Sequence, residues 1–139
     1  MIASADHPSE GADAPPTLLV IEDETLIRLD LSDHLRIEGF RVIEAASPKE
    51  AMAVLQSGAK IDLVLSDIHM PGRDDGISLL RWIGETFPTL PIVAASGVAS
   101  SLEMARSVTP TIVETVEKPF HTASLPARIR KYLDGSGRA

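Results

Sequence analysis

The sequence contains no cysteine and few aromatic residues. Its 139 residues include one tryptophan, one tyrosine and three phenylalanines. Without cysteine, disulfide bonds and thiolate metal sites are excluded, and the composition is compatible with a reducing compartment. Because aromatic residues make up only 4% of the chain while hydrophobic residues make up 44%, the core has to be built from leucine, isoleucine, valine and alanine.

The sequence also lacks an excess of basic residues and any long hydrophobic run. The formal net charge is −7, and lysine and arginine do not cluster. A nucleic-acid-binding surface is therefore not expected, because it would need clustered positive charge. No segment approaches about 18 consecutive apolar residues, and the N-terminus has no basic region followed by an apolar stretch. We expect no membrane span, no signal peptide and a cytoplasmic location.

The chain length allows one domain with a substantial core. Residues 1–16 consist mainly of small, acidic and proline residues with little to bury, so we expect a disordered N-terminal leader. The domain is expected over residues 17–133, and residues 134–139 should form a frayed tail. No second functional module, such as an output domain, is expected in this length.

Short apolar segments alternate with amphipathic segments along the domain. Strands are expected at residues 17–21, 40–45, 61–67, 91–95 and 111–116, each followed by a helix. The connections are long enough for right-handed crossovers between parallel strands. The pattern therefore predicts an α/β fold with a doubly wound, five-stranded parallel sheet in the flavodoxin-like order 2-1-3-4-5.

The first helix, expected from about Glu24 to Gly39, has apolar residues at helical spacing. Ile27, Leu31 and Leu35 should form its buried face. Its polar positions should face water: Arg28, Asp30, Asp33 and Arg36.

Polar side chains follow the predicted strands where each one ends. Glu22 and Asp23 follow the first strand, Asp67 ends the third, Ser96 follows the fourth and Lys118 follows the fifth. Because the carboxyl ends of parallel strands meet at one edge of a sheet, these residues should converge there. Taken singly, each acid has a simpler interpretation. Asp67 could cap the turn that begins after it, and the acids after the first strand could cap a helix.

Carboxylates brought this close together repel one another unless a cation lies among them. Mg²⁺ suits such a site, since it is held by one or two carboxylates together with water and phosphate oxygens. Lys118 could bind a phosphoryl oxygen, Ser96 could donate a hydroxyl hydrogen bond, and the amide of Gly97 could donate another. Asp67 is the one nucleophile among them, and carboxylates can accept phosphoryl groups as aspartyl phosphates.

With these motifs in order, the chain resembles the receiver domains of two-component response regulators over residues 17–133. The motifs are Glu22-Asp23, Ser66 to Gly72 around Asp67, Ser96-Gly97 and Lys118-Pro119-Phe120. The resemblance implies that Asp67 is phosphorylated by a histidine kinase or histidine phosphotransfer protein.

The same resemblance implies the roles of the other site residues. Mg²⁺ would be held by Glu22, Asp23, Asp67 and the backbone carbonyl of His69. The phosphoryl group would be contacted by Ser96, Gly97 and Lys118, which carry the conformational switch.

The sequence departs from the family pattern at three places. Family members usually have tyrosine or phenylalanine three residues before the lysine, but Thr115 occupies that position. Val98 is apolar where many relatives have a polar residue, so we expect a different rate of water attack on the phosphoaspartate. The loop 72–76 is one residue longer than the commonest form, which should be harmless.

The function we expect is that of a single-domain signalling module, which as an enzyme would catalyse only its own phosphorylation and dephosphorylation. It would signal by contact with a downstream protein that the sequence does not identify, or pass its phosphoryl group on. It would be a monomer or a weak dimer through the face formed by its fourth helix, fifth strand and last helix.

Three other functions remain open at this point. The first is a degenerate receiver that acts by protein contact without phosphate. The second is a small Mg²⁺-dependent phosphatase, because the string from Ile21 to Thr25 resembles the start of haloacid-dehalogenase-type phosphatases, although Glu22 and Glu24 replace the aspartates of that motif. The third is a flavodoxin-like cofactor binder, although the strand-end loops are acidic instead of phosphate-cradling.

Overall fold

A five-stranded parallel sheet forms the centre of the fold. The computed structural model describes residues 14–68 and 75–133, and its strands are β1 (Thr17–Ile21), β2 (Arg41–Ala45), β3 (Leu63–Asp67), β4 (Ile92–Ser96) and β5 (Ile112–Glu117). The strands lie in the order β2-β1-β3-β4-β5, and all neighbours are parallel. The predicted α/β class and the strand order 2-1-3-4-5 are confirmed.

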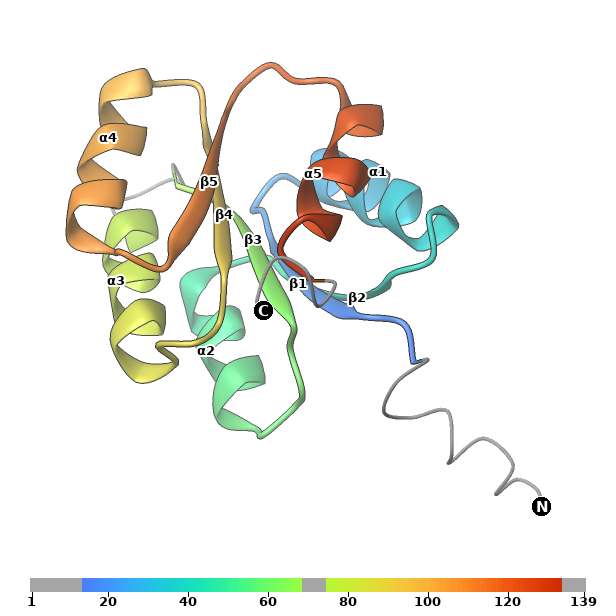
Figure 1. Ribbon diagram of the computed structural model, residues 1–139, viewed down its shortest axis with the longest axis horizontal. Coiled ribbons are helices and arrows are strands. Elements are labelled where there is room, and N and C mark those ends of the chain that lie inside the picture. Colours follow the sequence, from blue (N-terminus) through green and yellow to red (C-terminus); the bar gives the residue numbers. More distant parts are fainter. Residues whose placement is uncertain (1–13, 69–74, 134–139) are drawn as a thin grey trace.

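Helices cover both faces of the sheet (Figure 1). On one face lie α1 (Thr25–Ile37), the short 3-10 helix η3 (Thr122–Ser124) and α5 (Leu125–Arg130); on the other lie α2 (Pro48–Gln56), α3 (Asp75–Thr86) and α4 (Ala99–Val108). Alternate residues of β1 consequently enter two different cores. Leu18 and Val20 belong to the core beneath α1 and α5, whereas Leu19 and Ile21 belong to the other. Burial on both faces explains why the central strands are continuous apolar runs.

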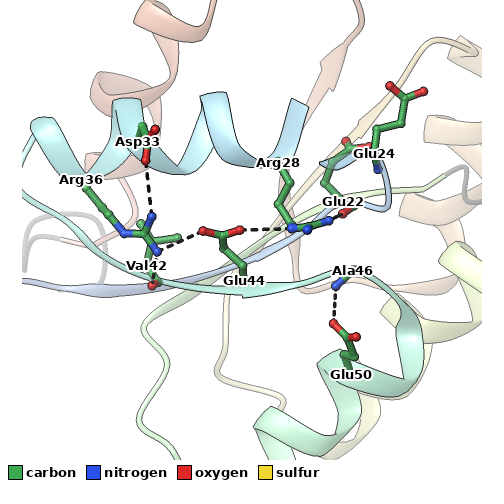
Figure 2. A network of polar contacts seen from close by, with 9 residues as sticks. All are labelled: Glu22, Glu24, Arg28, Asp33, Arg36, Val42, Glu44, Ala46 and Glu50. Atoms are coloured by element: carbon green, nitrogen blue, oxygen red, sulfur yellow. Dashed lines mark hydrogen bonds and ion pairs between the residues drawn. The ribbon is translucent and has the colours of Figure 1, made fainter. Parts of the chain in front are cut away.

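Local sequence signals define several helix ends. Ser47 is the N-cap of α2, and its hydroxyl accepts a hydrogen bond from the backbone N–H of Glu50 at 3.1 Å. The Glu50 carboxylate in turn accepts from the backbone N–H of Ala46, the residue before the N-cap, at 2.7 Å (Figure 2). This arrangement is similar to a capping box, in which the acceptor would bind the N–H of the N-cap itself. Gly39 and Gly58, which follow α1 and α2, have φ of +103° and +86°. Glycine is favoured at both positions because other residues rarely adopt this left-handed conformation.

Two expectations about the helices need correction. Leu31 and Leu35 are buried as predicted, but Ile27 is 40% exposed. Because α1 starts at the carboxyl edge of the sheet, its first turn extends beyond the strands that cover the rest of the helix. The sequence also predicts a last helix that continues to about Leu133, but α5 ends at Arg130 and only turn structure continues to Leu133. Among the helices of the described ranges, none has the length and apolar character required to cross a membrane.

Candidate functional site

The first two acids of the site lie immediately after β1. The backbone N–H of Glu22 continues the sheet by donating to the carbonyl of Ala45 at 3.0 Å. The Glu22 side chain is 4% exposed, and its Oε2 accepts from the backbone N–H of Glu24 at 3.2 Å. Asp23 is half-buried. Glu22 is therefore fixed through its backbone and its carboxylate, and Asp23 is presented beside it.

Asp67 is the last residue of β3 and is buried. Its strand lies at the centre of the sheet, between β1 and β4, and Asp67 pairs in register with Ala95. Glu22, Asp23 and Asp67 each offer a carboxylate oxygen within 4.8 Å of the others. Parallel strand pairing thus brings together acids that are more than forty positions apart in the sequence.

Lys118, which follows β5, reaches into this acid cluster. Its ammonium donates to Asp67 Oδ2 at 3.1 Å and to Glu22 Oε1 at 3.2 Å. Burial and the nearby Asp67 charge raise the pKa of Glu22 above its usual value, although contacts with Glu24 and Lys118 act in the opposite direction. Burial lowers the pKa of Lys118, but the charges and hydrogen bonds of Asp67 and Glu22 outweigh burial and raise it overall. The acid cluster therefore stabilises a cation.

The acid cluster fits a hard divalent cation. Three carboxylates from two adjacent strand ends offer only oxygen ligands, the type that Mg²⁺ prefers. The remaining ligand expected from the sequence, the backbone carbonyl of His69, lies outside the described residues.

Ser96 and Gly97 lie at the end of β4, next to the acid cluster. Ser96 is fully buried, and its hydroxyl accepts from the backbone N–H of Val98 at 3.0 Å, while Gly97 is exposed. The carbonyl of Ser96 accepts from the backbone N–H of Lys118 at 2.8 Å, which joins the ends of β4 and β5. All of the predicted site residues in the described ranges are thus at the same edge of the sheet.

Thr115 lies on β5 and is partly buried. Its hydroxyl accepts from Arg106 Nη1 of α4 at 3.5 Å, and its carbonyl accepts from Arg128 Nη2 of α5 at 3.4 Å. Relatives usually have tyrosine or phenylalanine at this position. In this chain, arginines from α4 and α5 both donate hydrogen bonds to Thr115.

Gly76 also shapes the site, a role that was not predicted from the sequence. A Cβ atom at Gly76 would lie 1.7 Å from the backbone carbonyl oxygen of Ile68, the residue after Asp67. Only glycine allows the start of α3 to approach the end of β3 this closely. The signal in the sequence was a glycine at the start of the helix that follows a strand ending in aspartate.

The prediction that Arg28 faces water was wrong. Its side chain is only 15% exposed, and its Nη1 donates to the backbone carbonyl of Glu22 at 2.9 Å (Figure 2). Helical periodicity placed Arg28 on the polar face, but periodicity carries no information about a carbonyl on the preceding turn.

Comparison with known proteins agrees with this geometry. The family described as the response regulator receiver domain matches residues 18–130. The transcriptional regulatory protein PdtaR of Mycobacterium tuberculosis is 33% identical over 120 residues, which are 85% of this chain and 58% of PdtaR. The sensor kinase CckA of Brucella abortus is 31% identical over 85% of this chain, but the match covers 12% of CckA. The chain therefore spans only part of the length of these relatives.

A solved structure shares the fold. The response regulator TrrA of Thermotoga maritima, determined in complex with Mg²⁺-BeF, is 27% identical with a TM-score of 0.74, covering 85% of this chain and 99% of TrrA. The family match extends over most of the chain. The chain belongs to the receiver domains of response regulators in two-component signalling.

Proposed function

We propose that the chain accepts a phosphoryl group on Asp67, with Mg²⁺, from a histidine kinase or histidine phosphotransfer protein. The observation that carries this proposal is the clustering of the Glu22, Asp23 and Asp67 carboxylates within 4.8 Å, with the Lys118 ammonium 3.1 Å from Asp67. A buried carboxylate beside two further acids and a cation has the groups that phosphoryl transfer needs, because the reaction depends mainly on positioning and charge neutralisation. The functional unit would be residues 17–133.

Each residue has a distinct role in the proposal. Glu22, Asp23 and Asp67 would hold Mg²⁺, together with the backbone carbonyl of His69. When bound, Mg²⁺ would neutralise charge on the carboxylates and on the phosphoryl oxygens. Lys118 would turn from the carboxylates of Glu22 and Asp67 to a phosphoryl oxygen.

Ser96 and Gly97 would supply the remaining hydrogen-bond donors. The Ser96 hydroxyl would donate to another phosphoryl oxygen, and the backbone amide of Gly97 would donate to the same group. Both residues lie at the end of β4, beside Asp67 in the sheet.

The phosphoryl group would be transferred to Asp67 by in-line displacement. An Asp67 carboxylate oxygen attacks the phosphorus of a phosphohistidine, and a new O–P bond forms while the P–N bond breaks. The donor's imidazole nitrogen keeps the electron pair of that bond and takes up a proton. Hydrolysis of the aspartyl phosphate by water would later restore the carboxylate and release phosphate.

We also propose that the phosphorylated domain is read by a partner protein at the face formed by α4, β5 and α5, or that the phosphoryl group is relayed onward. Support comes from apolar side chains exposed on and beside α4: Val98 at 46%, Met104 at 59% and Val108 at 39%. A monomer or a weak dimer through the same face is expected.

The phosphatase alternative has no support from the site. Haloacid-dehalogenase-type chemistry needs an aspartate nucleophile directly after the first strand, where this chain has Glu22, whose carboxylate accepts from the backbone of Glu24. A degenerate receiver would lack part of the acid cluster, whereas all three acids are present.

The test is phosphorylation by acetyl phosphate in the presence of Mg²⁺. The wild-type protein should gain one acid-stable, base-labile phosphoryl group, measured by intact-protein mass spectrometry. Asp67→Asn should abolish the gain, and Asp23→Asn should abolish the rise in melting temperature that Mg²⁺ produces by binding the folded state. Asp33→Asn, at an exposed acid of α1, is the matched control and should behave as wild type. A label that persists in Asp67→Asn would overturn the assignment of the acceptor.

A further inference from the structure

Arg28 links the acid cluster to the edge of the sheet. From α1, its guanidinium donates through Nη1 to the carbonyl of Glu22 at 2.9 Å and through Nε to Glu44 Oε1 on β2 at 3.1 Å (Figure 2). Two acceptors on different elements determine the orientation of the planar guanidinium, because its donors have a fixed geometry.

Glu44 is held in turn by a second arginine of the same helix. Its Oε2 lies 3.2 Å from Arg36 Nη2, and Arg36 also donates to the carbonyl of Val42 and pairs with Asp33. The side chain of Arg36 is 43% exposed, compared with 15% for Arg28. The two arginines therefore attach α1 to β2 in similar ways, but only Arg28 contacts the turn that carries the site.

The carbonyl that Arg28 binds belongs to the peptide between Glu22 and Asp23. The N–H of Glu22 is fixed by Ala45 and its carboxylate by the N–H of Glu24. The bond from Arg28 fixes the remaining polar group of Glu22. Rotation of this peptide would move the Asp23 carboxylate relative to those of Glu22 and Asp67.

We infer that Arg28 is a positioning residue for the Mg²⁺ site: it holds the Glu22–Asp23 peptide in the orientation that brings the three carboxylates together. This inference rests on the proposed function. Arg28 makes no contact with the reacting atoms, and its effect is exerted through the backbone. Residues that orient metal ligands from behind typically change metal affinity by about 10- to 100-fold when they are removed.

A purely structural role for Arg28 would be shared by Arg36. Both connect α1 to Glu44, and Arg36 additionally binds a β2 carbonyl. Arg36→Ala is therefore a matched control, since it removes a comparable attachment of the helix without touching the Glu22–Asp23 peptide. If Arg28 only attached the helix, both variants would lose stability and neither would lose Mg²⁺ affinity.

The experiment measures the Kd for Mg²⁺ by isothermal titration calorimetry, at a temperature where circular dichroism shows each protein to be folded. Arg28→Ala should bind Mg²⁺ at least about tenfold more weakly than wild type, and Arg36→Ala should stay within twofold. Arg28→Lys should be intermediate, because an ammonium on a shorter side chain does not span both acceptors. The Mg²⁺ concentration that gives half-maximal labelling by acetyl phosphate should rise in parallel.

The outcomes separate this inference from the function on which it rests. Wild-type affinity in Arg28→Ala, or equal weakening in Arg36→Ala, overturns the inference and leaves the proposed function intact. A wild-type protein that binds no Mg²⁺ and gains no phosphoryl group overturns both. If Arg28→Ala is unfolded at every temperature, Arg28→Lys decides: weakened binding supports the inference, and unchanged binding overturns it.

Discussion

Lys118 Nζ lies 3.1 Å from Asp67 Oδ2, although the two residues are 51 positions apart in the sequence. The ammonium also lies 3.2 Å from Glu22 Oε1, so it neutralises two of the three carboxylates that would hold a divalent cation. The two cations should therefore compete for the acid cluster.

This competition predicts the effect of Lys118→Met, which removes the charge and keeps the length of the side chain. Mg²⁺ should bind about fivefold more tightly to the variant, since a partly exposed charge pair contributes about 1 kcal/mol. The melting temperature in EDTA should fall, because the carboxylates would repel one another without a cation. Calorimetry and thermal denaturation measure these effects. Lys131→Met, at an exposed position of the C-terminal turn, serves as the control. An unchanged Kd in Lys118→Met would show that the ammonium does not compete.

The raised pKa of Glu22 predicts how stability depends on pH. Burial and the Asp67 charge make the protonated form more favourable in the folded protein than in the unfolded chain. Ionised Glu22 therefore destabilises the folded state, and this cost grows as the pH rises from about 4.5 through the higher folded pKa. Glu22→Gln should raise the melting temperature in EDTA at pH 7, and the gain should disappear below about pH 4.5.

Glu114 provides a control of opposite sign. Burial raises its pKa, but hydrogen bonds from Tyr132 and Arg128 and the charges of Arg128 and Lys131 outweigh burial and hold the pKa below the usual value. Ionised Glu114 stabilises the folded state above about pH 4.5, and this contribution is lost as the pH falls through the lower folded pKa. Glu114→Gln should lower the melting temperature at pH 7 and have little effect in acid. Shifts of the same sign in the two variants would contradict the pKa directions.

Gly76→Ala tests the contact between α3 and the end of β3. The added Cβ would lie 1.7 Å from the carbonyl oxygen of Ile68, so the backbone has to move. We expect a loss of about 1–3 kcal/mol in the free energy of unfolding, measured by urea denaturation. Gly58→Ala is a useful contrast: nothing lies within 4 Å of its Cβ position, so any loss there would come from its positive φ alone. A Gly76→Ala protein as stable as wild type would mean that α3 is not held at this distance.

The readout of phosphorylation should differ from that of receivers with an aromatic residue on β5. Thr115 is much smaller than the aromatic residue of those receivers, and it is bridged to α4 by Arg106. We expect movement of Ser96 to be transmitted to residues 97–107, which are mostly exposed and include Gly97, Ala99, Ser100 and Ser101.

Amide hydrogen exchange with and without beryllofluoride, a phosphoryl mimic, would measure this. Change in exchange should be concentrated in residues 97–110, and Arg106→Ala should enlarge it by removing the bridge to β5. If the exchange rates changed only in β5 and α5, and not in residues 97–110, the hypothesis would be contradicted.

The pattern of apolar segments and strand-end acids was enough to predict the sheet and the location of the site. The runs Leu18 to Ile21 and Leu63 to Leu65 are short and continuously apolar, which is typical of strands buried on both faces of a sheet. The helices predicted between the strands indicate crossover connections, which join parallel strands. Once the strands are parallel, residues at their carboxyl ends must meet. The convergence of Glu22, Asp67 and Lys118 therefore followed from strand order alone.

The side chains that support the site from behind could be identified only from the packing of the folded chain. Periodicity assigned Arg28 and Arg36 to the same polar face, yet the side chain of Arg28 is 15% exposed and binds the carbonyl of Glu22, whereas that of Arg36 is 43% exposed. Likewise, the sequence marks Gly76 as a glycine at a helix start after the Asp67 strand, but its close approach to the carbonyl of Ile68 depends on how α3 and β3 pack. A periodic pattern reports which face of an element is apolar. The depth at which a polar residue lies, and the backbone group it meets there, depend on how separate elements pack, and no local pattern records that.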